Sequence, residues 1–331
     1  MFTTTTNDYF YNISINDEWI WVPVPWAWWQ VIQLIFAIIG IMGNMVVMVV
    51  IFWPKRPRRS STDTLIGALA VADFLTSIFI IPHPTVARYP DNTWGKIFCK
   101  VVQCPTFRVT SACASIITLT TMSVERLVAV RFPFWFRRFF SPNRTSVAVI
   151  AIWVLSVLIN SWGLYTVHVV NGECVHSLPV GFHRFYGVLI FLVQYALPVV
   201  VMIVANLWAI FTLRQRRATA LRKAQTHILH MLLIVVITFV VTRTPIQVTF
   251  FLYNLGVVDF KYIFGPTYSS FVVLGFVNFC INPFIYAAKV PNFRRAVDDI
   301  KRSLRACRLD HDDHDFHPVF ALKQEDEECA Q

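Results

Sequence analysis

Charged residues are scarce in this chain. They make up only 15% of its 331 residues, whereas a typical soluble domain carries about 25%. Hydrophobic residues account for 56%, and the mean hydropathy is +0.55. This composition excludes an ordinary soluble domain and predicts an integral membrane protein.

The features of an enzyme are also missing. The sequence contains no soluble catalytic domain and no linker long enough to hide one. Nothing resembles a nucleophile–base pair or a closed metal site, which argues against catalysis. Residues 1–17 are polar and lack a basic start followed by an apolar run, so we expect no cleavable signal peptide.

The net charge of +10 could suggest a nucleic-acid partner, but its distribution argues against one. Basic residues cluster at 55–59, 137–144, 214–223 and 294–305, all on one side of the proposed membrane. The intervening loops are nearly balanced in charge. Because basic loops stay in the cytoplasm, we predict an extracellular N-terminus and a cytoplasmic C-terminus.

Long apolar runs supply the fold prediction. A membrane-spanning helix needs about 20 apolar residues. We therefore predict an all-α membrane protein with seven transmembrane helices, at residues 28–52, 64–82, 101–130, 146–167, 185–213, 226–255 and 263–288. Tryptophans near the first helix are typical of an interfacial belt: Trp19, Trp21, Trp26, Trp28 and Trp29.

Three polar signals interrupt these apolar runs. They are Asn-Pro-Phe-Ile-Tyr at 282–286, Glu-Arg-Leu at 125–127, and Asp73 at the end of Leu-Ala-Val-Ala-Asp. Polar groups inside a membrane are costly, so such groups indicate function. The three signals, each in its expected span and in the expected order along the chain, resemble those of the rhodopsin-like (class A) G-protein-coupled receptors. The resemblance covers residues 32–305.

The resemblance implies roles for these residues. Arg126 is expected to pair with Glu125 and, once freed, to line the cavity that receives a G protein. Asn282, Pro283 and Tyr286 are expected to take part in activation. A polar network that holds a sodium ion is expected from five residues: Asn44, Asp73, Ser115, Asn278 and Asn282.

The sixth span departs from the family at two places. The usual Cys-Trp-x-Pro reads Thr-Arg-Thr-Pro, so Arg243 replaces the tryptophan, two residues before Pro245. A buried charge persists only if it is paired, and we hypothesise that Arg243 reaches toward Asp73 and substitutes for sodium. The alternative is an arginine that points into a wet ligand pocket. Gln225 and Thr226 stand where rhodopsins place an acid facing the arginine, which favours high basal activity.

The fifth span and the outer loops carry further departures. Asn206 stands where the family has a tyrosine that meets Tyr286 in the active state. The family's disulfide joins the third span to the second outer loop, where Cys174 lies. Its partner is Cys99 or Cys104. We prefer Cys99, although it precedes Arg126 by two residues more than usual, and Pro105 could distort this helix start.

The ligand pocket excludes two ligand classes. Arg108 stands where amine receptors have an aspartate, and Phe276 stands where opsins have their retinal-binding lysine. Arg108 suits a carboxylate, unless it pairs internally. The residues expected to face the pocket are His83, Arg108, Gln194, Gln247, Phe250, Tyr253, Tyr268 and Val272.

Local sequence texture favours a peptide ligand. Residues 115–126 look like neuromedin U receptors, and residues 244–246 look like opioid receptors. Both are neuropeptide receptors, so an extracellular peptide and a heterotrimeric G protein are the expected partners. An acidic lipid or small carboxylate mediator is the alternative ligand. A seven-span transporter or channel is the alternative class, disfavoured by the lack of internal repeats.

These predictions divide the chain into four parts. They are an extracellular segment at 1–27, the bundle at 28–290, a short amphipathic eighth helix at 291–306 and an acidic cytoplasmic tail at 307–331. Asn12 lies in a glycosylation sequon, and Cys307 is either palmitoylated or a free thiol. The tail has no serine or threonine after Ser303 but carries acids at 325–328, which could partly imitate phosphates toward arrestin. We expect a plasma-membrane protein in contact with membrane lipids.

Overall fold

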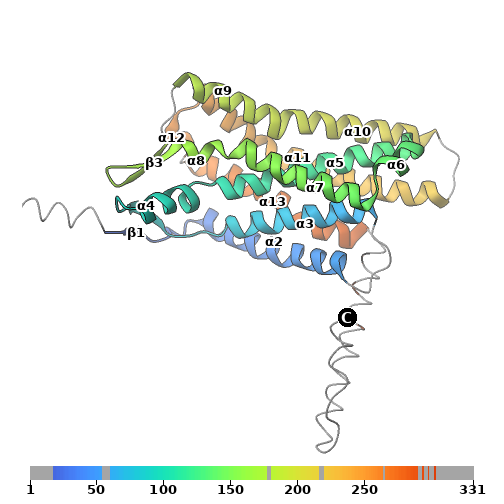
Figure 1. Cartoon of the computed structure of the whole chain (residues 1–331), viewed down its shortest axis with the longest axis horizontal. Helices are drawn as coiled ribbons and strands as arrows, with labels where there is room; N and C mark the ends of the chain where they lie inside the picture. The colour runs from blue at the N-terminus through green and yellow to red at the C-terminus, as the bar shows by residue number, and fades with distance from the viewer. Residues whose placement is uncertain are drawn as a thin grey trace, which may run out of the picture.

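The computed structural model of the chain describes residues 18–53, 60–176, 180–215, 220–263 and 265–289, together with Phe293, Val297 and Arg302. In this part of the chain, seven helical segments are long and apolar enough to cross a membrane. They lie along the long axis of the molecule as one bundle (Figure 1). The predicted seven-helix membrane fold is therefore confirmed.

The spans follow one another along the chain. The first two are α2 (Trp28–Phe52) and α3 (Ser61–Phe79), and the third combines α4 (Thr93–Phe98), the π-helix η1 (Cys99–Gln103) and α5 (Thr106–Arg131). The short α6 (Pro133–Phe139) precedes the fourth span, α7 (Pro142–Asn160), which α8 (Trp162–Thr166) extends. The fifth combines α9 (Val180–Phe191), the π-helix η2 (Leu192–Ala196) and α10 (Leu197–Arg214). The last two are α11 (Ala220–Asn254) and α13 (Pro266–Lys289), with α12 (Phe260–Ile263) between them.

Polar capping residues place two helix starts earlier than predicted. Helix α3 begins at Ser61 rather than at residue 64, because the Ser60 hydroxyl accepts a hydrogen bond from Asp63 N at 3.1 Å. The Asp63 carboxylate in turn accepts from Ser60 N at 3.0 Å, which completes a capping box. Helix α7 likewise follows Ser141 and has a proline in its first turn. A hydropathy pattern finds only the apolar part of a helix and misses these polar turns.

The third span starts earlier than predicted and is interrupted. Asn92 caps α4 by accepting from Gly95 N at 2.9 Å, so the helical segment begins at Thr93 instead of residue 101. Pro105 has no N–H and disfavours helical geometry in the residue before it. Cys104 accordingly adopts an extended conformation with ψ of 126°. The break between η1 and α5 lies within the stretch from Cys99 to Arg126, which is two residues longer than the spacing usual in the resembled family.

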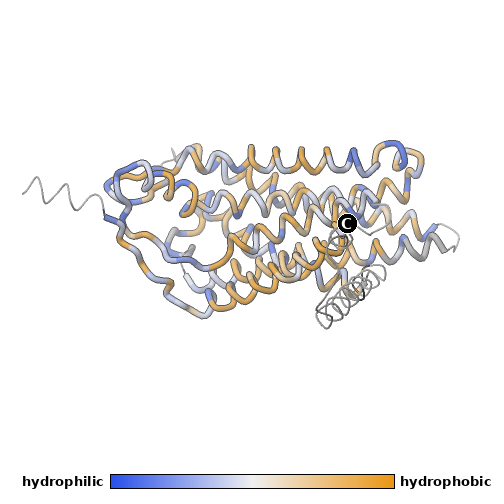
Figure 2. The backbone as a smooth tube through the Cα atoms, turned by 60° about the horizontal axis from the view of Figure 1, so that its bottom comes forward, coloured by the Kyte–Doolittle hydropathy of each residue, from blue (hydrophilic) through white to orange (hydrophobic). Residues whose placement is uncertain are grey.

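The bundle is packed around α5, which contacts α3, α7 and α10. Its core includes Met122, Met202, Phe239 and Tyr286, each at most 2% exposed. The outer surface is also apolar, as expected for a lipid-facing surface. On α7 an exposed stripe contains Val147, Ile150, Val154 and Leu158. Figure 2 shows hydrophilic residues gathered at the two ends of the bundle.

One end of the bundle, called the disulfide end below, carries two small antiparallel sheets. Strand β1 (Ile20–Val22) pairs with β2 (Thr85–Arg88), and β3 (Val167–Val170) pairs with β4 (Glu173–His176). Asn171 and Gly172 form the β3–β4 turn with φ of 54° and 81°, the left-handed geometry that an Asn-Gly turn favours. Tyr89 N donates to Gly172 O at 2.8 Å and links the two sheets.

The disulfide joins Cys99 of η1 to Cys174 of β4, so the preferred pairing is confirmed and Cys104 is a buried free thiol. Two of the predicted belt tryptophans pack beside it. Trp19 stacks on Trp21 at 5.7 Å between ring centroids and meets the edge of Phe98 at 5.1 Å. Trp19 and Phe98 pack in one cluster with Cys99 and Cys174, so the rings form a cap beside the disulfide, and the interfacial belt stays a prediction.

Candidate functional site

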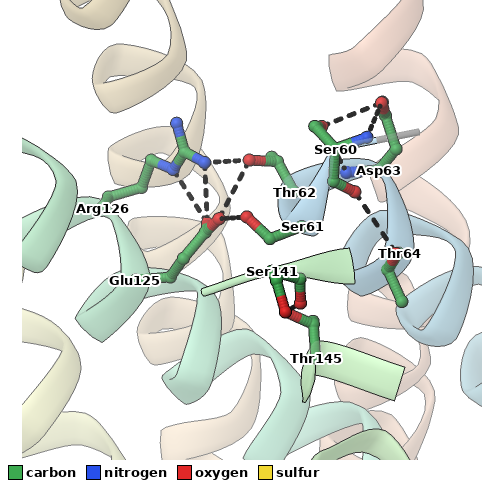
Figure 3. Close-up of polar contacts among 9 residues, drawn as sticks. All are labelled: Ser60, Ser61, Thr62, Asp63, Thr64, Glu125, Arg126, Ser141 and Thr145. Carbon is green, nitrogen blue, oxygen red and sulfur yellow. Dashed lines mark hydrogen bonds and ion pairs between the residues drawn. The ribbon is translucent and has the colours of Figure 1, made fainter. Parts of the chain in front are cut away.

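At the opposite end of the bundle, called the arginine end, Glu125 is completely buried. Its Oε2 accepts from Arg126 Nε at 3.0 Å and Arg126 Nη2 at 2.7 Å (Figure 3). Its Oε1 accepts from Ser61 Oγ at 2.7 Å and Thr62 Oγ1 at 3.0 Å. Arg126 also donates to Thr62. The buried charge is therefore fully paired, and α5 is tied to the first turn of α3.

Ser61 and Thr62 are functional candidates that the sequence analysis missed. The run Ser60-Ser61-Thr62 at the start of a span was a detectable signal. Such hydroxyls usually indicate helix capping, and only Ser60 has that role here. The other two hydroxyls lie next to Glu125 because α3 packs against α5.

Asp73 is the buried acid in the middle of the bundle, with an exposed fraction of 0%. Its Oδ1 accepts from Ser115 Oγ at 2.6 Å and its Oδ2 from Asn282 Nδ2 at 2.7 Å, which joins α3, α5 and α13. Asn44, by contrast, donates to the carbonyl oxygens of Gly40 and Phe279, both at 2.9 Å. The structure thus brings part of the predicted polar network into direct contact with Asp73.

The remaining member of that network, Asn278, is 1% exposed, and its Oδ1 has no hydrogen-bond partner. Asn282 and Asn44 also leave their Oδ1 atoms unpaired. Buried polar atoms of this kind usually contact an ordered water or an ion. The oxygens without a partner in this network are thus amide oxygens, whereas both carboxylate oxygens of Asp73 already accept hydrogen bonds.

Arg243 does not form the ion pair with Asp73 that we expected. Its guanidinium lies over the ring of Phe279, with 5.2 Å from Cζ to the centroid. The side chain is only 9% exposed, and its Nε has no hydrogen-bond partner. Both Asp73 oxygens already accept hydrogen bonds from Ser115 and Asn282, so the arginine interacts with Asp73 only through space.

A cavity of about 760 Å³ opens at the disulfide end between α2, α3 and the start of α5. Two predicted ligand residues, His83 and Arg108, line it together with Gln30 and Gln33. Arg108 lies over the ring of Phe276, with 6.0 Å from Cζ to the centroid. The cavity therefore combines apolar walls with one guanidinium and a few polar groups, as ligand sites do.

The other predicted ligand residues lie outside the lining of this cavity. Gln194 is buried and donates to Asn160 Oδ1 at 3.0 Å, so it joins the fifth span to the fourth. The rings of Phe250 and Tyr253 lie 6.4 Å apart on α11. Partly buried positions are also found for Gln247, Tyr268 and Val272.

The fifth span makes two polar contacts with neighbouring helices. Asn206 is 1% exposed and donates to Ser123 Oγ at 3.0 Å, which ties α10 to α5. The Tyr286 hydroxyl is buried without a partner. The hydroxyls of Tyr195 and Thr244 share a hydrogen bond directly before Pro245. No sequence pattern predicted this pair, because Tyr195 contacts α11 from within the π-helix η2.

Several predictions fall outside the described residues, namely glycosylation at Asn12, palmitoylation at Cys307, and the tail at 307–331. Within the predicted eighth helix only three residues are described. Phe293 is 7% exposed and packs in the main core, with Val297 against the same cluster. An eighth helix stays a prediction.

Comparison with known proteins agrees with this arrangement. Residues 43–286 match the model of the 7 transmembrane receptor (rhodopsin family). The chain is 30% identical over 293 residues to the Allatostatin-A receptor of Bombyx mori, a match that covers 81% of this chain and 78% of the relative. It is 28% identical over 283 residues to Galanin receptor 2b of Danio rerio, covering 80% and 73%.

Proposed function

Because the chain belongs to the rhodopsin family of seven-transmembrane receptors, we propose that it binds an extracellular neuropeptide and activates a heterotrimeric G protein. Members of this family are receptors and not enzymes. The relatives named above are receptors for allatostatin-A and galanin, which are neuropeptides. Their similarity extends over about four-fifths of the chain, which supports a ligand of the same class.

The observation that carries the proposal is the contact between Arg126 and Glu125. The guanidinium is 12% exposed and the carboxylate 0%, so the pair is held almost entirely within the protein. Separating the two groups frees the guanidinium at the arginine end of the bundle. A G protein can then bind a surface that the closed cluster does not present.

Charge supports the assignment of this end to the cytoplasm. Arg131, Arg137, Arg138 and Arg144 all lie on or beside α6. Basic residues next to membrane spans favour the cytoplasmic side. The disulfide end then faces the oxidising exterior, where a disulfide persists. These features support our proposal that the receptor lies in the plasma membrane with its N-terminus outside.

The cap at the disulfide end supports a peptide ligand. Strand β1 exposes apolar side chains there, with Ile20, Trp21 and Val22 exposed to 50%, 51% and 41%. Exposed apolar surface of this kind indicates a contact surface. A peptide is long enough to touch this cap and to reach the cavity beside Arg108 at the same time.

A second candidate is a receptor for an acidic lipid or a small carboxylate mediator. The specific observation in its favour is Arg108, which lines the cavity. Within the described chain, no carboxylate lies in ion-pair contact with it. A ligand carboxylate would satisfy that guanidinium.

The proposal extends to further features of the chain. We propose that sodium at Asp73 is disfavoured by the nearby positive charge of Arg243. We further propose glycosylation at Asn12, palmitoylation at Cys307, contact of the 291–306 segment with membrane lipids, and arrestin as a cytoplasmic partner. A transporter or channel function would instead appear as ion flux without G-protein activation.

The test is G-protein dissociation in cells that express the intact chain, measured across all G-protein classes against a neuropeptide library. A response is expected to a peptide, and Arg126→Ala should abolish it at equal surface expression. Arg184→Ala is the matched control, because Arg184 is an exposed arginine at the other end. No response to any peptide, but a response to acidic lipids or small carboxylates, would favour the second candidate.

A further inference from the structure

Two arginines each place their guanidinium over a phenylalanine ring of α13. Arg108 of α5 lies over Phe276, and Arg243 of α11 lies over Phe279, at 6.0 and 5.2 Å from the ring centroids. Residues three apart on a helix share a face, so the two rings bring both guanidiniums to the same side of α13. The two positive charges therefore occupy one column between three helices.

The two arginines repel each other. Their charges interact electrostatically, and the low polarity of a membrane interior strengthens such repulsion. Within the described residues, neither guanidinium is in ion-pair contact with an acid. Asp73, the nearby acid, already accepts from Ser115 and Asn282. The column thus contains two cations without a directly bound anion, which is a costly arrangement.

Arg243 also has an unsatisfied donor. It is 9% exposed, and its Nε makes no hydrogen bond. A Cβ on Gly275 would be in ordinary van der Waals contact with Arg243 Nη1 at 3.5 Å, so the glycine leaves a methyl-sized space beside the guanidinium. A buried donor without a partner costs free energy, so the site is suited to an acceptor that the protein itself does not provide.

The cavity at the disulfide end reaches one member of the pair. Arg108 lines the cavity of about 760 Å³ that opens there. Arg243 lies deeper, because Phe279 follows Phe276 along a helix that runs from the disulfide end toward the arginine end. Arg108 is therefore the member of the pair that lines the cavity, and Arg243 lies outside its lining.

We propose that Arg108 and Arg243 together bind one small anionic group between their guanidiniums. The group is either a carboxylate of the ligand or a chloride ion. The carboxylate source rests on the proposed receptor function, whereas chloride binding does not. In both cases the anion neutralises the repulsion between the two arginines and accepts hydrogen bonds from both.

The test is the thermal unfolding of the purified full chain in phosphatidylcholine nanodiscs, without ligand or G protein. The probes are sodium chloride, sodium acetate and sodium gluconate at equal sodium concentration and ionic strength. Fixed sodium removes any contribution from sodium at Asp73. A small anion that binds the folded protein should raise the unfolding midpoint by about 2 °C or more over bulky gluconate.

Variants of the two arginines test whether the difference in unfolding midpoint between anions arises at this site. Arg243→Gln and Arg108→Gln should each remove the difference between anions, whereas Arg184→Gln should keep it. Arg108 is the less buried of the pair, so Arg108→Gln serves if Arg243→Gln fails to fold. Stabilisation by acetate alone supports the ligand-carboxylate source, and stabilisation by chloride supports the ion.

Two results would overturn the proposal. One is an unfolding midpoint that is the same in all three anions. The other is an anion effect that survives in Arg243→Gln or Arg108→Gln. Because the measurement uses no agonist and no G protein, its failure leaves the proposed receptor function intact, and failure of the signalling assay leaves the anion site intact.

Discussion

Arg126 Nη2 lies 2.7 Å from Oε2 of Glu125, its immediate neighbour in sequence, and both groups also bond to Thr62 of α3. The closed cluster therefore depends on one buried carboxylate. A charged hydrogen bond contributes about 1.5–3 kcal/mol, which is enough to control how often Arg126 is free. This relationship leads to the first prediction.

Glu125→Gln should raise ligand-independent signalling by about tenfold, because neutral glutamine holds Arg126 more weakly. The measurement is nucleotide exchange on purified G protein without ligand, at equal receptor concentration. Asp63→Asn is the control, since Asp63 belongs to the capping box of α3 rather than to the cluster. Exchange by Glu125→Gln at the wild-type rate would contradict the prediction.

The unmodified receptor should already signal without ligand. Gln225 of α11 is the position at which the family resemblance implies an acid facing Arg126, and a neutral glutamine offers the arginine no opposite charge. Gln225→Glu should lower the basal signal, because it adds that opposite charge. The comparison is with mock-transfected cells, and a basal signal equal to theirs would sink the idea.

Cys174→Ser should destabilise the receptor, since the Cys99–Cys174 bond links η1 to β4. Loss of a native disulfide typically costs about 2–5 kcal/mol. We expect a lower unfolding midpoint and less receptor at the cell surface. Cys104→Ser is the matched control, because Cys104 is a buried free thiol. Peptide mapping without reduction should find Cys99 joined to Cys174, and a Cys104–Cys174 peptide would refute the pairing.

Agonist affinity should be insensitive to sodium. Arg243 places a positive charge near Asp73, and both Asp73 oxygens already accept hydrogen bonds. The measurement is agonist competition in sodium against the same concentration of a large organic cation, with chloride held constant. A sodium-dependent shift that disappears in Asp73→Asn would show that sodium does bind there.

Arrestin recruitment should be weak and largely independent of receptor kinases. The tail has no serine or threonine after Ser303, so kinases lack a substrate there, whereas its acids at 325–328 carry fixed negative charge. Recruitment measured with and without a kinase inhibitor should be equal. Removing residues 325–328 should lower it, and strong inhibitor-sensitive recruitment would count against this view.

The spans could be predicted well because each must present about 20 apolar residues to lipid, a local property of the chain. Helix ends were predicted less well. Ser60 and Asn92 begin their helices in polar turns that hydropathy does not detect. The interruption at Cys104 depends on Pro105, whose effect was visible in the sequence but whose outcome, a π-helix, was not.

Some residues of the candidate site could likewise be predicted from the sequence, and others could not. Asp73, Glu125 and Arg126 were identifiable because charges in apolar runs are rare. Their partners Ser61 and Thr62 were not, since hydroxyls occur throughout the spans and only packing selects two of them. Gln194 stays a predicted ligand residue, and its hydrogen bond to Asn160 was not visible in the sequence.

The amino-acid sequence by itself determined the seven spans, their charge asymmetry and the positions of the buried ionisable groups, because burial in lipid acts on each segment separately. Only the tertiary structure decided which groups meet. Asp73 bonds Ser115 and Asn282 rather than Arg243, and Arg243 lies over Phe279. Such contacts depend on the rotation and depth of several helices at once, and these are set by side-chain packing across the whole bundle.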